Sequence, residues 1–165
     1  MYDFAIWDVM NRRTYPHVSA DLHIRSLIRA QDRHVYMVVP TLTNEGALTA
    51  NHWTLHVDLP SGLARCDLDT HNVLTAVGEI REGARRMSRY EYSSERQPPH
   101  CRSRLLPGET HCLDEGRGFG QLLLRIEGEI GYALLDNQPP LCWTLFVDNA
   151  PKREGMIEYA RWCNW

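Results

Sequence analysis

A strictly alternating segment at residues 52–59 constrains the fold of this chain more than any other feature of its sequence. One face of the segment carries large apolar residues: Trp53, Leu55, Val57 and Leu59. The other face carries polar residues: His52, Thr54, His56 and Asp58. A period of two is the pattern of a β-strand with one face in a hydrophobic core. Because a Pro60-Ser61-Gly62 turn signal follows, the sequence predicts a hairpin with a second strand at residues 63–69.

The remainder of the chain is interpreted as a mixture of strands and helices. Further strands are expected at residues 34–39, 87–92 and 132–135. Helices are expected where apolar residues recur at helical spacing, at residues 21–28, 114–128, 142–147 and 156–160. Together, these expected strands and helices predict an α+β fold, with a mainly antiparallel sheet and helices packed on it.

Length and charge restrict the classes of protein that this chain can represent. At 165 residues, it is expected to form a single domain spanning residues 1–165. The formal net charge of -3 gives no electrostatic reason to expect nucleic acid as a partner. No apolar run approaches the roughly 20 residues needed to span a bilayer, and the first residues lack the layout of a signal peptide. We therefore expect a cytoplasmic protein with neither a nucleic-acid nor a membrane partner.

The cysteines and the C-terminal residues carry two further expectations. The five cysteines form no C-x-x-C pair and are odd in number, which argues against a disulfide framework. The last four residues, Trp162-Cys163-Asn164-Trp165, are conspicuously apolar for the end of a chain. They are expected to pack on the domain or on a second copy, so a homodimer through the C-terminus is predicted.

A candidate catalytic constellation combines residues that are distant in the sequence. Cys142 follows two prolines and precedes an expected helix, and a helix N-terminus favours the reactive thiolate form of cysteine. His52 begins the alternating strand and could act as the base. Asp69, or alternatively Asp67, could orient the histidine from the next strand. The three residue types predict a Cys-His-Asp site.

Four further residues are expected to bind substrate: Trp53, His56, Gln138 and Trp143. The Gln138 side-chain amide could stabilise an oxyanion close to Cys142. His52 and His56 are about 13 Å apart along one strand, so only one of them can face the cysteine directly. The pairs His100-Cys101 and His111-Cys112 lack the usual spacing of zinc ligands. No metal site and no cofactor are predicted.

The order of these residues resembles that of the Ulp-type SUMO proteases, which are cysteine peptidases with a permuted papain-like fold. The match is carried by four elements: His52-Trp53, Asp69 seventeen positions after His52, Gln138, and then Cys142. The resemblance implies a papain-like fold and a peptide-like substrate. The chain departs from the family at Trp143, where the family has glycine after the catalytic cysteine.

A second resemblance covers more of the chain, from about residue 34 to residue 158. A fungal family of small uncharacterised proteins has similar blocks in the same order: Asn51-His52-Trp53, Tyr90-Glu91-Tyr92-Ser93, Pro107-Gly108-Glu109-Thr110, residues 119–126, and Cys142-Trp143. This resemblance implies a possible fungal source. Because genes of such proteins can lie with natural-product pathways, it also implies a possible role in secondary metabolism.

Three functions remain open from the sequence. The first is a thiol enzyme that acts on an amide, ester or thioester through Cys142, His52 and Asp69. The second is a cyclase or isomerase that binds a natural product in an aromatic, histidine-containing pocket without a covalent intermediate. The third is a non-catalytic binding protein. The expected ligand is a small-molecule or peptide-like compound.

Overall fold

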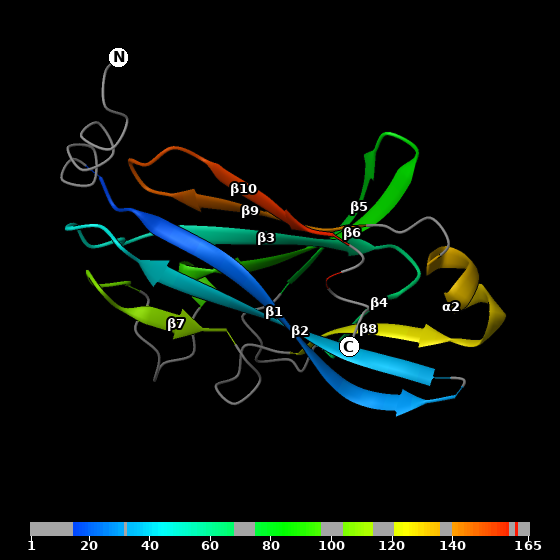
Figure 1. The fold of residues 1–165 in the computed structure, drawn as a ribbon. Coiled ribbons are helices and arrows are strands. Elements are labelled where there is room, and N and C mark those ends of the chain that lie inside the picture. Colours follow the sequence, from blue (N-terminus) through cyan, green and yellow to red (C-terminus); the bar gives the residue numbers. More distant parts are fainter. Residues whose placement is uncertain are drawn as a thin grey trace, which may run out of the picture.

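Two antiparallel β-sheets pack face to face in the computed structural model of the protein (Figure 1). The structure describes residues 15–31, 33–67, 75–96, 104–113, 121–135, 140–158 and 161. In Figure 1, strands β3, β9 and β10 lie in the upper part of the view and β8 in the lower part, while β1 runs diagonally from the upper left to the lower right beside its partner β2. A hydrophobic core fills the space between the two layers.

The strands of each sheet come from distant parts of the sequence. The first sheet contains β1 (Val18–Ala30), β2 (Arg33–Asn44), β8 (Gln121–Glu127) and β4 (Ala64–Asp67) in spatial order, with β7 (Thr110–Cys112) also paired to β2. The second sheet contains β10 (Arg153–Ile157), β9 (Leu141–Val147), β3 (Trp53–Pro60), β6 (Arg85–Ser93) and β5 (Thr75–Glu82). β3 therefore occupies the centre of the second sheet, between β6 and β9.

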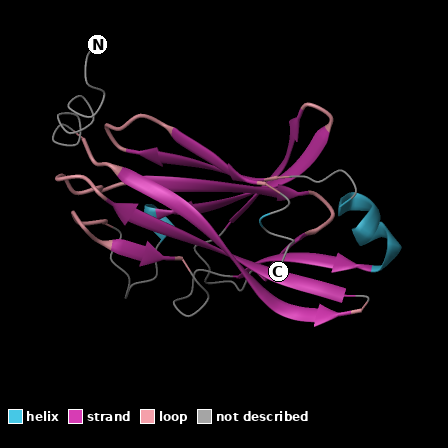
Figure 2. Cartoon of the chain, viewed as in Figure 1, coloured by secondary structure: helices cyan, strands magenta, loops and turns pink. Residues whose placement is uncertain are grey.

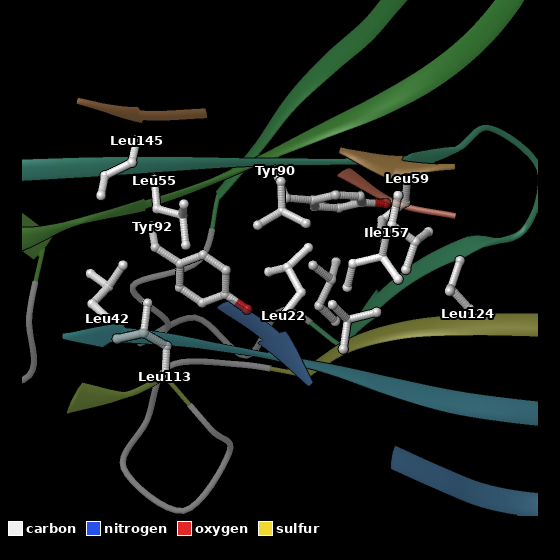
Figure 3. Close-up of a cluster of buried hydrophobic side chains, with 14 of the residues drawn as sticks. Leu22, Leu42, Leu55, Leu59, Tyr90, Tyr92, Leu113, Leu124, Leu145 and Ile157 are labelled. Carbon is white, nitrogen blue, oxygen red and sulfur yellow. The ribbon is translucent and has the colours of Figure 1, made fainter. Parts of the chain in front are cut away.

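The alternating segment forms β3, as the sequence predicts. Leu55 lies opposite Tyr92 of β6 and Leu145 of β9, and all three side chains are fully buried. Figure 3 shows these three side chains meeting Leu42 and Leu113 from the other layer. The buried face of β3 is thus the middle of the core, because alternate residues of a strand point to the same side of the sheet.

The predicted hairpin between residues 52–59 and 63–69 is wrong, although a strand follows the turn. β4 pairs with β8 in the first sheet and is not a neighbour of β3. The turn at residues 61–63 carries the chain from one layer to the other, and the Arg125 amide donates to the Leu63 carbonyl at 2.9 Å. The fully buried Leu63 side chain belongs to the shared core, so burial favours this crossing.

The prediction of an α+β fold with packed helices is also wrong. Figure 2 shows that strands dominate the described residues. Beside the strands, the described part of the chain contains the helix α2 (Gly128–Leu135) and a short 3₁₀ turn, η1 (Ser94–Arg96). The strand expected at residues 132–135 belongs to α2. The two-sheet architecture excludes the permuted papain-like fold that the first resemblance implies.

β8 shows why helical spacing was misleading. Three of its residues point into the core between the sheets: Leu122, Leu124 and Ile126. Leu123 is buried on the opposite face of the same sheet, together with residues of β2. A strand that buries both faces carries a continuous apolar run, and periodicity alone does not distinguish such a run from a buried helix. Residues 114–120 of the expected helix lie outside the described residues.

The other three expected helices correspond to strands β1, β9 and β10 in their described parts. Leu27 and Ile28 completed the helical pattern at residues 21–28, yet their side chains are 44% and 37% exposed. β1 instead pairs with β2 along its length, with a register shift between Ser26 and Ile28. Cys142 lies within β9, opposite Asp58 of β3, so no helix N-terminus lies at this cysteine. Residues 159–160 of the last expected helix are not among the described residues.

Within the described residues, no helix has the length and hydropathy that crossing a membrane would require.

Candidate functional site

An open cleft of about 780 Å³ lies at the end of the sandwich where β3 begins and β9 ends. Four separate segments of the chain contribute its lining residues: Pro16, Leu48, Thr49, Asn51, His52, Arg104, Asp148 and Asn149. The cleft therefore lies beside the start of the alternating strand, and His52 and its neighbour Asn51 form part of its wall.

Backbone hydrogen bonds bring three of these segments together. Ala50 and Leu105 exchange both of their backbone hydrogen bonds, at 3.0 and 2.9 Å, which places Arg104 next to the segment that contains Asn51. The Asp148 amide donates to the His52 carbonyl oxygen at 3.1 Å. The wall of the cleft is thus held by the main chain, and its side chains are free to contact a ligand.

Asn44 joins two walls of the cleft from within the protein. Its side chain is completely buried, and Nδ2 donates to the carbonyl oxygens of Leu48 at 2.8 Å and Leu105 at 3.0 Å. Its Oδ1 accepts from the Gly46 amide at 3.0 Å. In the sequence, Asn44-Glu45-Gly46 has only the composition of a turn. The positioning role of Asn44 cannot be found from the sequence, because Leu105 lies sixty-one residues further along the chain.

The turn between β9 and β10 presents the last two lining residues. Asn149 has a left-handed backbone conformation with a φ of 59°, and the Ala150 amide closes the turn on the Val147 carbonyl oxygen at 3.1 Å. Asparagine tolerates this conformation better than most residues other than glycine. The turn therefore directs Asp148 and Asn149 to the cleft at little cost in backbone strain.

Five polar side chains of the cleft form no hydrogen bond or ion pair with another side chain in the described part of the chain: Asn51, His52, Arg104, Asp148 and Asn149. Arg104 and Asp148 carry opposite charges and share one cleft, yet they do not pair. Their hydrogen-bonding groups are therefore available to a ligand.

The structure does not bring the predicted nucleophile and base together. Cys142 lies opposite Asp58, whereas His52 lies opposite Asp148 at the other end of the β3–β9 pair. Six residues of extended chain separate His52 from Asp58, which corresponds to about 20 Å. A proton cannot pass directly between groups that far apart. The prediction of a cysteine hydrolase is therefore wrong.

His56 and Cys142 lie on the outer face of the second sheet, away from the cleft. His56 Nε2 is 3.0 Å from Glu91 Oε2, and Arg96 Nη1 is 3.5 Å from Glu91 Oε1. The imidazole also contacts the ring of Phe146 edge to face, with centroids 5.3 Å apart. The sequence assigned His56 to substrate binding, and the structure places it in a hydrogen bond with Glu91 of the neighbouring strand β6.

The two tryptophans assigned to substrate binding do not line the cleft. Trp53 is 2% exposed and belongs to the core, and the Trp143 indole lies over Gly155 of β10. The aromatic pocket that was expected for a natural-product cyclase is therefore not formed by these two residues. The remaining predicted site residues, Asp69 and Gln138, lie outside the described residues, as does the C-terminal segment 162–165.

Comparisons with known proteins do not assign the chain to a family. No protein-family model and no curated protein sequence matches it. One solved structure with some similarity is a glycoside hydrolase family 20 exo-β-N-acetylglucosaminidase from Vibrio harveyi in complex with N-acetylglucosamine, with a TM-score of 0.33 and 10% sequence identity. The match covers 84% of this chain but only 17% of that enzyme. A similarity this low defines neither a shared fold nor a shared activity.

Proposed function

We propose that the protein is a non-catalytic binding protein and that a small molecule binds in the cleft beside His52. One observation carries this proposal: the polar side chains of three chain segments converge on the cleft and have no hydrogen-bond partners in the described part of the chain. A polar ligand would supply those partners.

The dimensions and rigidity of the cleft support the same proposal. Ligand sites are typically clefts of about 300–1,000 Å³ with a few polar groups that fix the orientation of the ligand. The cleft of about 780 Å³ falls within this range. Its walls are held by the Ala50–Leu105 bridge and by the buried Asn44 side chain. A preformed wall lowers the entropic cost of binding, because fewer groups must be ordered when the ligand arrives.

The composition of the cleft favours binding over catalysis. The described residues of its lining include no cysteine, and the carboxylate among them, Asp148, is not hydrogen-bonded to His52 through its side chain. Covalent catalysis requires a nucleophile within hydrogen-bond reach of a base. The lining residues present donors and acceptors without such a pair.

The proposal is tested by protein-observed NMR with three chemically distinct probes: cellobiose, glucose 6-phosphate and glycylglycine. We expect at least one probe, at millimolar concentration, to shift the amide signals of Asn51, His52 and Asn149, and His52→Ala to weaken that response. The matched control is His23→Ala, because His23 lies on β1 and its side chain is 61% exposed. The proposal fails if none of the probes shifts the cleft signals, or if both variants respond like the original protein.

A further inference from the structure

Among the described residues that line the cleft, the positive and negative side chains balance one another. Arg104 supplies one positive charge and Asp148 one negative charge, while Thr49, Asn51 and Asn149 are uncharged. An anionic ligand would meet the unpaired carboxylate, and a cationic ligand would meet the unpaired guanidinium. Like charges in one site cost binding free energy, so the pair discriminates against a ligand with a net charge of either sign.

The uncharged side chains select further among neutral ligands. Each asparagine amide offers two donors and an acceptor, and the threonine hydroxyl both donates and accepts. A ligand hydroxyl also donates and accepts, so it can satisfy either part of an amide. In a zwitterion, the ammonium group only donates and the carboxylate only accepts, so each group must lie opposite the matching half of an amide. The combination of donors and acceptors in this cleft therefore suits ligand hydroxyl groups.

The two charged side chains are also effective partners for hydroxyl groups. The Asp148 carboxylate has two acceptor oxygens and can accept from two adjacent hydroxyls, while the Arg104 guanidinium presents several donors in a fixed plane. Hydrogen bonds with one charged partner are shorter and stronger than those between neutral groups. Each charge can thus contribute to the binding of a neutral molecule.

The apolar part of the cleft completes the match. Leu48 is 42% exposed and lines the cleft with Pro16. An exposed apolar side chain gains free energy when a ligand covers it. Sugars have C–H groups on the faces of their rings and hydroxyl groups around the edge, so one molecule can cover Leu48 and reach the polar wall.

We infer that the ligand is a neutral, hydroxyl-rich molecule of the saccharide class, bound between the Asp148-Asn149 turn and the Asn51-His52 segment. This inference rests on the proposed function. Asn149 is its most specific test, because glycine adopts a left-handed backbone conformation without steric cost. Asn149→Gly therefore removes the amide and retains the turn. Asn149→Asp retains the size of the side chain but removes its donor and adds a negative charge.

The experiment titrates the full chain calorimetrically with cellobiose, maltose and lactose, and separately with glucose 6-phosphate and glycylglycine. We expect at least one neutral disaccharide to bind about tenfold more tightly than the anionic glucose 6-phosphate or the zwitterionic glycylglycine. Asn149→Gly and Asn149→Asp should each weaken that binding by about threefold to tenfold, the range for loss of one hydrogen bond. Asn149→Gly should not lower the melting temperature.

Each contrary result has a separate meaning. Preferential binding of glucose 6-phosphate or glycylglycine in the cleft would overturn the saccharide class and leave the proposed function standing. If neither Asn149 variant alters the affinity, the inferred position of the ligand is wrong. If none of the five probes binds in the cleft, both the inference and the proposed function fail.

Discussion

Asn44→Ala should unfold the protein more easily through the loss of three buried hydrogen bonds. The side chain donates to the carbonyl oxygens of Leu48 and Leu105 and accepts from the Gly46 amide. The net contribution of one such bond is about 1 kcal/mol, so the three together contribute about 3 kcal/mol. The Leu105 carbonyl retains the Ala50 amide as a partner, which limits the further loss to Leu48 and Gly46. A loss of this size is a large fraction of the 5–15 kcal/mol that stabilises a typical domain.

Urea denaturation followed by tryptophan fluorescence measures this loss, because Trp53 is buried in the core. Thr110→Ala is the matched control: it removes one exposed hydrogen bond, in which Thr43 Oγ1 and Thr110 Oγ1 are 3.1 Å apart, from the same end of β2. We expect the control to lose no more than about 0.5 kcal/mol. If Asn44→Ala loses no more than the control does, the inferred positioning role of Asn44 is wrong.

Asn44→Asp separates the loss of hydrogen bonds from the loss of volume. Aspartate has nearly the same size and can still accept from the Gly46 amide, but it cannot donate to the two carbonyl oxygens. A buried carboxylate beside two carbonyl oxygens is unfavourable. We therefore expect this variant to be at least as unstable as Asn44→Ala, and retained stability would show that filling the space is sufficient.

Three further substitutions test other parts of the structure. Arg89→Met should lower the free energy of unfolding by about 3 kcal/mol or more, because it leaves the buried Asp58 carboxylate without Arg89 Nε, which lies 2.7 Å away. Adding Asp58→Asn should restore part of the lost stability, and thermal melts of the single and double variants measure both effects. Gly155→Ala should cost about 1–3 kcal/mol by overlap with the Trp143 indole, and a second change, Trp143→Leu, should recover most of that loss in a urea titration. Cys142→Ala should leave the affinity of any cleft ligand unchanged within about twofold, since the thiol lies at the other end of the β3–β9 pair. A tenfold loss of affinity in calorimetric titration, which is about 1.4 kcal/mol, would instead place Cys142 in the binding site.

Local pattern predicted some strands well and misassigned others. The residues of β3 alternate cleanly because one of its faces is the core and the other is partly exposed. β8 has apolar residues on both faces, since both faces of the first sheet are buried there. The helical assignments at β1 and β9 failed for a related reason: helix spacing and strand spacing overlap in short apolar runs, and pairing with a neighbouring strand decides between them.

Some residues of the candidate site could likewise be identified from the sequence, and others could not. The sequence alone indicated that His52 stands at the start of the alternating strand, and this follows from neighbouring residues only. It did not indicate that Asn44, Arg104 and Asn149 contribute to the same end of the sandwich.

The sequence by itself determined which face of β3 is buried and that His52 stands at the start of that strand, because both depend on the local alternation of apolar and polar residues. Only the tertiary structure decided which strands flank β3 and in which register, and hence that Cys142 and His52 are about 20 Å apart. The physical reason is that strand register is set by hydrogen bonds and side-chain packing between segments far apart in the chain. The same long-range contacts assemble the cleft, through the buried Asn44 side chain and the Ala50–Leu105 bridge.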